Sequence, residues 1–325
     1  MVVAAPPGGL AERLVQRARE YAANAREPAT RRAYQGDWRR FTEWCSAQGV
    51  EPLPPDPVRV AAYAAWMADG GTRGKPYGVA TIRRALASIA VVSLAAGYDY
   101  PYADRGICAT MEGIARKLGV KQRKMAPLEV EALSECFARH RDDLLGLRDK
   151  SMVALGFFFA ARRASLADVE VEHISFVPEG LHLTLPKTKT DPTGAQADVP
   201  IGIPYARNPA VCAVRLLKQW LAASGITTGP VFRRVFKSGA KIGERRLDPG
   251  SIARIIKGMV EEVGLDPTLY AGHSLRSGFI TSCARRRVPL DAIMRQSRHK
   301  SEKIVMGYIR VANVLDETNA ARAIT

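Results

Sequence analysis

The longest apolar run of the chain, MVALGFFFAA (Met152–Ala161), limits what the protein can fold into. The run is too short to cross a bilayer, which takes about 20 apolar residues. It is followed at once by Arg162 and Arg163, so it predicts a buried helix inside a globular domain. A chain of 325 residues is long enough to surround such a helix and to form two domains.

Residues 28–116 have the periodicity of a small all-α domain. PATRRAYQGDWRRFTEWCSAQG predicts a helix that ends at Gly49. One face of this helix carries Tyr34, Trp38, Phe41 and Trp44/Cys45. DPVRVAAYAAWMADGG and GVATIRRALASIAVVSLAAG predict two more helices, each closed by glycine. The polar sides of these helices are basic. Residues 1–27 are rich in Ala, Pro and Arg and are expected to form a loose tail that is followed by one helix.

Residues 117–127 form the expected interdomain linker. The stretch Arg116–Lys124 is basic, polar and contains glycine, and Pro127 begins a new helix. Such a charge run is commonly just a solvated surface. A linker that crosses DNA phosphates explains better why all the charges in this stretch are positive. The residues expected to contact phosphates are Lys121, Arg123 and Lys124.

Residues 128–325 predict a second, mixed domain that is mainly helical. It opens with helices and continues into HISFVPEGLHLTLPKTKTDPTGAQADVPI, an alternating hairpin with a third strand. After Pro209 the chain is again helical, broken by a basic loop, RRVFKSGAKIGERR. The fold class is therefore mostly α, with a small antiparallel sheet in the second domain.

The charge balance indicates a polyanionic partner. Lys and Arg total 48 against 32 Asp and Glu, which gives a net charge of +16. Nucleic acid is the first candidate, and a merely basic enzyme is the alternative. The five cysteines contain no CxxC pair, so neither a disulfide framework nor a zinc site is indicated. The N-terminus lacks the features of a signal peptide, so we expect a cytoplasmic protein with reduced thiols and no membrane partner.

No cofactor site is indicated by sequence motifs. The chain has no P-loop, no glycine fingerprint after a strand, no HExxH and no cluster of metal-ligand spacing. No small-molecule substrate is expected either. If the protein cuts a phosphodiester bond, its own side chains must stabilise the developing charge.

Six residues together could do this chemistry. His273 and Arg276 are three apart at a predicted helix start, so they share a face. The other four come from separate segments of the second domain: Arg162, Lys189, His299 and Tyr308. Each of them alone is more often a structural or solvent-facing residue, and His140, His173 and His182 are placed in that class. As a set they fit phosphoryl transfer to a tyrosine, with guanidiniums gripping phosphate oxygens and a lysine protonating the leaving oxygen.

The series Arg162, Lys189, HSLR, RH and YIR resembles the tyrosine recombinase (phage integrase) family over residues 29–325. KIVMGYIR, the KTKT turn and the four-helix first domain look most like the Cre-type simple recombinases. The resemblance implies a helical core-binding domain and a tyrosine recombinase catalytic domain. It also implies cleavage to a 3′-phosphotyrosine, strand exchange through a Holliday junction and religation, without metal or ATP.

By this resemblance, Tyr308 is the nucleophile and Lys189 the general acid. His273 and Arg276 form the H-x-x-R box, Arg162 is the first clamp arginine, and His299 stands where relatives have histidine or tryptophan. Two positions depart from the family pattern. Ser165 replaces a glutamate, and Arg298 replaces the usual glycine before His299, which is expected to add charge near the phosphate.

The resemblance also implies a DNA clamp. Arg31, Arg32 and Arg84 would lie on helices in the major groove, and Ser251 and Arg254 would read DNA from the second domain. The tail VANVLDETNAARAIT would dock into a neighbouring protomer, which gives a homotetramer on two inverted-repeat sites. A bacterial or phage origin, on the nucleoid, is expected. Two alternatives remain open: a type IB topoisomerase-like enzyme and a DNA-binding relative that has lost catalysis. The short segment before the first domain leaves no room for an additional arm-binding domain.

Overall fold

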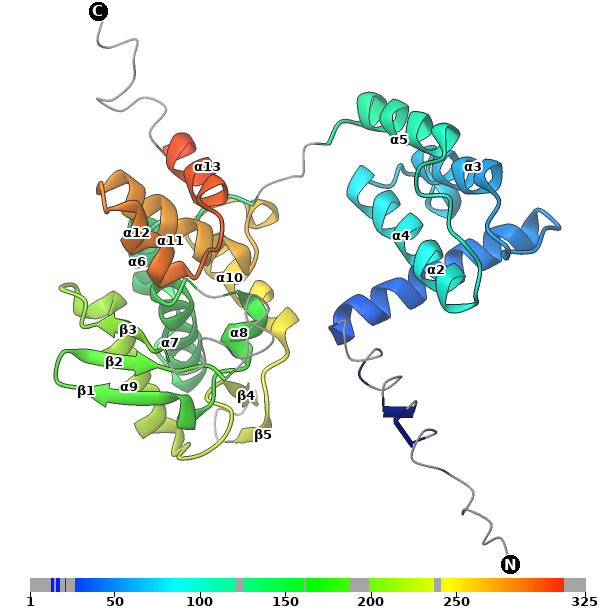
Figure 1. Ribbon diagram of the computed structural model, residues 1–325. Coiled ribbons are helices and arrows are strands. Elements are labelled where there is room, and N and C mark those ends of the chain that lie inside the picture. Colours follow the sequence, from blue (N-terminus) through cyan, green and yellow to red (C-terminus); the bar gives the residue numbers. More distant parts are fainter. Residues whose placement is uncertain are drawn as a thin grey trace, which may run out of the picture. The chain divides into compact units, whose positions relative to one another are not determined.

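The computed structural model describes residues 13–14, 16–17, 21, 27–120, 125–160, 162–186, 199–236 and 241–312. The chain divides into two compact units, Met1–Arg123 and Lys124–Thr325, which are treated separately below (Figure 1). Several predicted site residues lie outside the described ranges: Lys121, Arg123, Lys124, Lys189 and the tail from residue 313. The predicted helix before residue 27 lies mostly outside them as well.

The first unit is helical. Its described helices are α2 (Pro28–Ala47), α3 (Pro57–Ala68), α4 (Val79–Ala95) and α5 (Arg105–Leu118), with a 3₁₀ turn at Gly71–Arg73. Asp56 and Asp104 start α3 and α5 by accepting backbone hydrogen bonds from Arg59 and Ile107. The three helices that the sequence predicted after residue 28 are present. Helix α5, which no expected helix specified, continues the chain to Leu118.

Aromatic packing forms the core of the first unit. Phe41 and Tyr63 are fully buried and meet edge to face, with ring centroids 5.0 Å apart. Trp44 and Trp66 extend the cluster from α2 and α3. These residues follow the helical spacing that predicted one apolar face on α2.

The second unit is mostly helical and includes two small sheets. Its α-helices are α6 (Val130–Arg139), α7 (Leu144–Phe158), α8 (Arg163–Ala167), α9 (Ala213–Ser224), α10 (Pro249–Glu262), α11 (His273–Arg285), α12 (Leu290–Ser297) and α13 (Glu302–Ala312). Its strands are β1 (Ile174–Val177), β2 (Gly180–Leu183), β3 (Ile201–Pro204), β4 (Arg233–Val235) and β5 (Ile242–Arg246). Short 3₁₀ turns occur at Val171–His173, Pro209–Val211 and Pro267–Leu269. The mostly α fold class predicted from the sequence is confirmed.

Helix α7 is the centre of the second unit. Its segment Ser151–Phe157 is buried, as the apolar run predicted, and the helix packs against α9 and α11 (Figure 1). A Cβ placed on Gly156 would come within 2.6 Å of Leu166 and 2.8 Å of Leu275. The missing side chain therefore lets α8 and α11 approach α7 closely. Arg162 immediately precedes α8, and the His273–Arg276 pair lies on α11.

The three-stranded sheet has the predicted antiparallel order β1-β2-β3, with Ile174 opposite Leu183 and Leu181 opposite Ile203. The expected basic loop over residues 233–246 is wrong, because its ends form a second sheet, β4–β5. Val235 on β4 is buried in the core, while the preceding Arg234 is exposed. Backbone hydrogen bonds across the hairpin, including Phe236 N–H to the Lys241 carbonyl at 3.0 Å, stabilise the two strands. Their many charged residues obscured the alternating pattern by which a strand is predicted.

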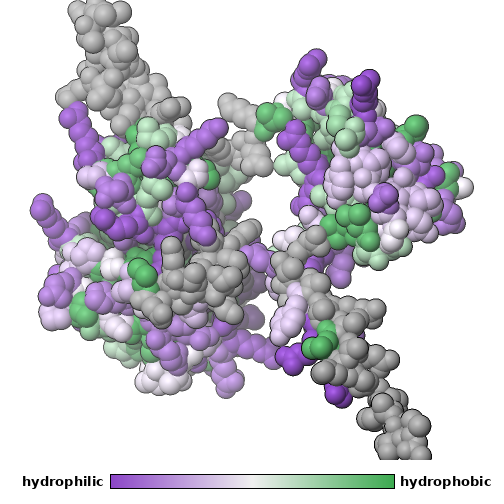
Figure 2. Space-filling view, viewed as in Figure 1, coloured by the Kyte–Doolittle hydropathy of each residue, from purple (hydrophilic) through white to green (hydrophobic). Residues whose placement is uncertain are grey.

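Polar residues dominate the outer surfaces. Figure 2 shows hydrophilic residues over much of the visible surface of each unit, with hydrophobic residues in small separated spots. Within the described ranges, no helix is long and apolar enough to cross a bilayer.

Candidate active site

Arg276 is the most deeply placed member of the candidate site. It lies one turn after His273 on α11, and only 3% of it is exposed. Its Nη1 donates to the Ala160 carbonyl at 2.7 Å, whereas its buried Nη2 has no hydrogen-bond partner among the described residues. Burial and the nearby Arg162 charge lower the pKa of Arg276 to about 10, so it remains cationic at neutral pH.

The carbonyl that holds Arg276 comes from an unusual turn. Ala160 follows the end of α7 with a φ of 49°, a left-handed conformation that non-glycine residues rarely adopt. Arg162 comes two residues later, in extended conformation just before α8. The end of the apolar helix thus delivers both the carbonyl that binds one guanidinium and a second guanidinium near the first.

Tyr308 faces His273 across the site. The tyrosine hydroxyl lies 2.8 Å from His273 Nε2, within hydrogen-bond distance. Burial lowers the pKa of His273, and the charges of Arg276 and Arg162 lower it further. Burial raises the pKa of Tyr308, while the Arg276 charge opposes that rise. A protonated Tyr308 can therefore donate to a neutral His273, which is the arrangement of a nucleophile and its general base.

Helix packing holds this pair in place. Val305 on α13 is fully buried against Ile280 of α11 and Ile293 of α12, and Tyr308 joins the edge of this cluster. The amphipathic spacing of α13 places Tyr308 one turn after Val305. The tyrosine is thereby fixed by apolar contacts beside the helix that carries His273 and Arg276.

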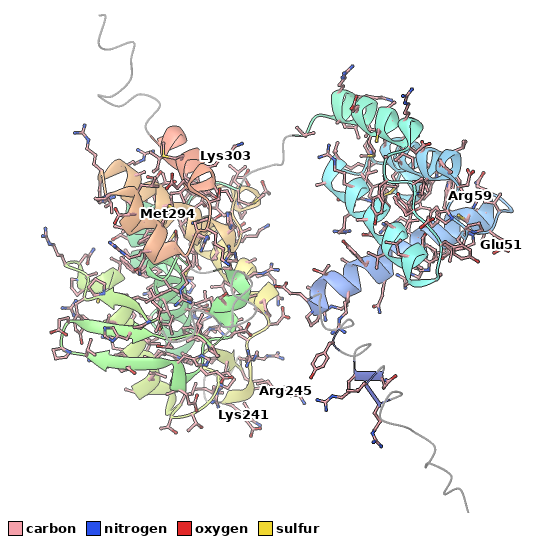
Figure 3. The ribbon with its side chains drawn as sticks, viewed as in Figure 1. Glu51, Arg59, Lys241, Arg245, Met294 and Lys303 are labelled. Atoms are coloured by element: carbon pink, nitrogen blue, oxygen red, sulfur yellow. The ribbon has the colours of Figure 1, made fainter. Side chains whose placement is uncertain are left out.

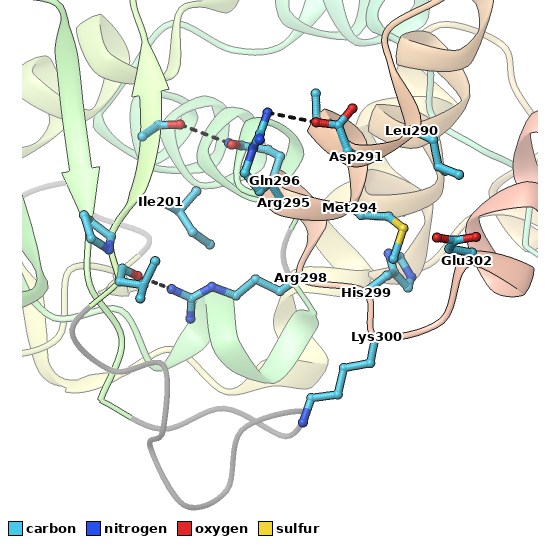
Figure 4. Close-up of a pocket in the computed structure, with 14 residues that line it drawn as sticks. Ile201, Leu290, Asp291, Met294, Arg295, Gln296, Arg298, His299, Lys300 and Glu302 are labelled. Carbon is cyan, nitrogen blue, oxygen red and sulfur yellow. Dashed lines mark hydrogen bonds and ion pairs between the residues drawn. The ribbon is translucent and has the colours of Figure 1, made fainter.

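His299 completes the set after α12. Burial lowers its pKa to about 4, with further contributions from the charges of Arg276, Arg162 and His273. Its Nδ1 lies 2.8 Å from the hydroxyl of buried Ser297. His299 also lines a cavity of about 1080 Å³ between β3 and α12, together with Met294 and Glu302 (Figure 4).

The segment before His299 is anchored to its surroundings. Gln296 Nε2 donates to the carbonyls of Phe158 at 2.8 Å and Gly202 at 3.1 Å, which ties α12 to the end of α7 and to β3. Arg298 has a φ of 50°, which explains why a glycine would suit this position. Arg298 also donates to the Val199 carbonyl beside β3 (Figure 4). From the sequence, the charge of Arg298 was expected near the phosphate. The contact with Val199 instead directs the guanidinium toward β3.

The structure therefore brings five of the six predicted catalytic residues together, with Arg276 at the centre and the other four near it: Arg162, His273, His299 and Tyr308. Lys189 lies outside the described residues. Three predicted structural histidines differ from this group. His140 is buried and bonded to Glu262, His173 accepts a backbone hydrogen bond from Glu170, and His182 is exposed on β2.

The arrangement suits an anionic ligand. The Arg276 guanidinium lies near both Arg162 and the Tyr308 hydroxyl, and its buried Nη2 has no hydrogen-bond acceptor within the described chain. Guanidiniums bind phosphate oxygens strongly and stabilise charge that develops during displacement. Among the residues in view, no group of three His, Cys, Asp or Glu side chains could hold a metal ion.

The predicted DNA-contact residues occupy different settings. Arg31 and Arg32 are exposed on α2. Arg84 instead makes two hydrogen bonds to buried Asp37, at 2.7 and 3.1 Å, while 44% of its side chain remains exposed. On α10, Arg254 donates to Ser251 at 2.9 Å, so the predicted pair is in contact.

A basic groove beside α10 was missed by the sequence argument. It has a volume of about 1020 Å³ and joins Ser251 and Arg254 to the β4–β5 hairpin. Lys241 and Arg245 extend from this hairpin side of the unit (Figure 3). The density of Lys and Arg in RRVFKSGAKIGERR was the available signal, but its strands were interpreted as a loop.

Comparisons with known proteins agree with this geometry. Residues 123–314 match the phage integrase family. The chain is 36% identical over 312 residues to an integrase/recombinase XerD homologue of Selenomonas ruminantium, with 94% of this chain and 88% of that protein covered.

Solved structures share the fold. A XerH site-specific recombinase bound to palindromic difH substrate aligns with a TM-score of 0.62 at 15% identity, covering 90% of this chain and 78% of that one. The Tn1549 transposon integrase in complex with transposon right end DNA aligns with a TM-score of 0.59 at 13% identity, covering 90% and 92%.

Proposed function

The chain belongs to the phage integrase family and is a tyrosine site-specific recombinase, and on this premise we propose that Tyr308 cleaves DNA through a covalent 3′-phosphotyrosine. The observation that carries the proposal is the 2.8 Å contact between Tyr308 and His273 beside buried Arg276. A tyrosine paired with a neutral histidine, next to the guanidiniums of Arg162 and Arg276, is suited to phosphoryl transfer.

The first step forms one ester and breaks another. Arg162, Arg276 and His299 bind the non-bridging oxygens of the scissile phosphate. Tyr308 Oη attacks phosphorus, and its proton passes to His273 Nε2. The bond from phosphorus to the 5′ oxygen breaks, and Lys189 protonates that oxygen. The enzyme then holds the 3′ phosphate on Tyr308.

Religation reverses this step with a new strand. A 5′ hydroxyl attacks the phosphotyrosine and gives its proton to Lys189, while the bond from phosphorus to Tyr308 Oη breaks and Tyr308 recovers its proton from His273. The ester conserves the energy of the cleaved bond, so neither ATP nor a metal ion is required. Exchange of one strand pair and then the other passes through a Holliday junction.

DNA is held by both units in this proposal. The first unit contributes Arg31 and Arg32 and the second contributes Ser251 and Arg254, with the linker cations Lys121, Arg123 and Lys124 crossing phosphates between them. The hairpin cations beside α10 extend the second surface. Phosphate contacts of this kind position a protein, whereas base contacts specify the sequence.

The assembly follows from the symmetry of the reaction. Two inverted-repeat sites offer four cleavage positions, and a homotetramer supplies one Tyr308 to each. The tail from residue 313 docks between protomers. The enzyme acts on the bacterial nucleoid, in the cytoplasm.

The test needs no known target. The protein is incubated with genomic DNA that flanks its own gene, the reaction is stopped with denaturant, and protein-linked 3′ ends are mapped. We expect adducts at one inverted-repeat site, and their loss in Tyr308→Phe, which should still bind DNA. Adducts scattered over the DNA would instead indicate a topoisomerase-like enzyme. Adducts that persist in Tyr308→Phe would remove Tyr308 as the nucleophile.

A further inference from the structure

Ser297 makes two hydrogen bonds with one hydroxyl group. It is the last residue of α12, only 1% of it is exposed, and its Oγ lies 2.7 Å from the Ile293 carbonyl oxygen. The same Oγ lies 2.8 Å from His299 Nδ1. A serine hydroxyl carries one proton and can also accept hydrogen bonds. Because the hydroxyl has one proton, donation in one contact requires that Ser297 accept in the other.

The Ile293 carbonyl can only accept, so the hydroxyl proton must lie between it and Ser297. This bond to the carbonyl four residues earlier is a common use of serine in helices. Donation to His299 instead would leave two oxygens 2.7 Å apart with no proton between them. Ser297 Oγ must consequently accept from His299, and Nδ1 of His299 must carry a proton.

The imidazole cannot easily leave this contact. Gln296 binds the carbonyls of Phe158 and Gly202, and Arg298 binds the Val199 carbonyl from a left-handed backbone conformation. The residues on both sides of Ser297 are thus tied to α7 and β3. His299 follows directly, so its backbone position is determined by the same anchors.

A neutral imidazole holds one proton, so Nδ1–H leaves Nε2 as a bare acceptor. Its surroundings oppose a second proton. Burial lowers the pKa of His299 to about 4, and Arg276, Arg162 and His273 add to the effect. The same cavity is lined by two carboxylates, Asp291 of α12 and Glu302 of α13, and by three cations, Arg295, Arg298 and Lys300. His299 is therefore neutral at pH 7 without DNA.

We propose that Ser297 is a positioning residue that holds His299 as the Nδ1–H tautomer, so that His299 donates to a DNA phosphate only after binding one proton from solvent. The proposal rests on the proposed function, in which His299 contacts the scissile phosphate. The proton adds to Nε2, and no other bond changes. The site gains one positive charge when the phosphate brings its negative charge. His299 thereby adds no cationic repulsion to Arg162 and Arg276 in the DNA-free enzyme.

Nitrogen NMR of the full chain tests the tautomer without DNA. The protein is labelled with ¹⁵N-histidine, and the His299 signals are identified by their absence in His299→Gln. At pH 7 we expect a protonated Nδ1 and a bare Nε2 in the wild type and in Ser297→Thr, which keeps the hydroxyl. In Ser297→Ala the ring should move toward the Nε2–H tautomer that a free histidine side chain favours.

The wild-type spectrum alone can overturn the proposal. A cationic His299, or one with its proton on Nε2, would contradict it, as would an unchanged tautomer in Ser297→Ala. Unaltered signals from the other four histidines, buried His140 included, show that the variant is folded.

A kinetic measurement tests the consequence for the reaction. The rate of adduct formation on a mapped target is followed against pH for wild type, Ser297→Ala and Ser297→Thr. The requirement for one proton makes the wild-type rate fall by up to about tenfold per pH unit in the alkaline range. Ser297→Ala can donate from neutral Nε2–H, so its rate relative to wild type should rise with pH. The ratio of variant to wild-type rate cancels any titration that the proteins have in common.

A constant rate ratio between Ser297→Ala and wild type would contradict the proposal. Total absence of wild-type adducts would overturn the proposed function instead, and the tautomer measurement would still decide the role of Ser297.

Discussion

Asp37 in the first unit and Arg276 in the second are buried charges with opposite surroundings. In the first unit, Asp37 is 1% exposed and is met by Arg40 at 3.0 Å and by Arg84 at 2.7 Å. In the second, Arg276 is almost as deeply buried, and no carboxylate of the described residues lies within ion-pair distance. Among the described residues, the Arg276 guanidinium donates to a neutral group, the carbonyl of Ala160.

The difference distinguishes a buried charge that stabilises the fold from one that is available to bind a ligand. A buried charge that is paired and hydrogen-bonded is compensated within the fold, as Asp37 is between α2 and α4. A buried cation without a counter-charge lowers stability until an anion arrives. The second arrangement is therefore useful only if the protein binds an anion there, and a phosphodiester in DNA is the anion that this family processes.

The largest effect is expected from replacing Arg276, the buried cation that has no counter-charge among the described residues. Arg276→Met should slow adduct formation by about 10²–10³-fold, the usual cost of removing one donor to a developing oxyanion. The free energy of unfolding should not fall, because a buried guanidinium without a counter-charge is removed. Adduct kinetics and thermal unfolding measure the two effects.

Arg285 is the matched control on the same helix. It pairs with Glu129 at 2.8 Å near the surface. Arg285→Met should leave the rate of adduct formation near that of the wild type. A loss of stability in Arg276→Met as large as its loss of activity would show that Arg276 is structural, like Asp37.

The next effect concerns how α11 is held. A Cβ on Gly278 would come within 1.8 Å of the Leu128 carbonyl oxygen, whereas one on Gly258 of α10 would meet nothing within 4 Å. Gly278→Ala should destabilise the second unit by about 3 kcal/mol, at the upper end of overpacking effects. Gly258→Ala should stabilise it by about 0.5–1 kcal/mol.

Hydrogen exchange followed by mass spectrometry separates the two units and checks both glycine variants. Faster exchange in α11 peptides of Gly278→Ala is expected, with the first unit unaffected. Equal stability of the two variants would mean that α11 is not fixed by this close backbone contact.

A smaller effect is expected in the first unit. Arg84→Met leaves Asp37 buried with one arginine fewer and should cost about 1–2 kcal/mol, the penalty for a poorly satisfied buried acceptor. Arg83→Met, the exposed neighbour on α4, removes the same charge and should change stability by less than about 0.5 kcal/mol. Tryptophan fluorescence reports mainly this unit, because three of the four tryptophans, Trp38, Trp44 and Trp66, lie within it. Identical unfolding midpoints for the two variants would show that Arg84 does not stabilise the core, and would leave DNA contact as its role.

The smallest effect is a pH dependence in the second unit. Burial alone would lower the pKa of His140, but Asp149 and Glu262 outweigh it and raise the pKa. The stabilisation is then complete below about pH 6.5, the unfolded value, and is lost as pH rises through the folded pKa. His140→Gln should therefore lose more stability at pH 6 than at pH 8. A loss that is equal at the two pH values would show that the histidine contributes no charge here.

Local patterns allowed much of the site to be predicted. His273 and Arg276 share a face because they are three apart on a helix, and Tyr308 follows Val305 on an amphipathic one. The apolar run before Arg162 predicted the buried helix that delivers it. The family resemblance then selected these residues from the many arginines of a basic chain.

The rest depended on contacts between distant segments. Nothing near Arg84 indicates that it meets Asp37, 47 residues earlier, so it was interpreted only as a DNA contact. The hairpin β4–β5 was missed because charged residues hid the alternation around Val235. Ser297 and Gln296 carry no motif, and their importance is visible only once Ile293, Phe158 and Gly202 supply carbonyls beside them.

The most direct test identifies the amino acid that bonds to DNA. Adducts formed on a mapped target are trapped with denaturant, digested with nuclease and protease, and sequenced by mass spectrometry. We expect a nucleotide joined through its 3′ phosphate to Tyr308, in a peptide that ends near Arg310. A nucleotide on any other residue, or cleaved DNA without a protein-linked 3′ end, would contradict it.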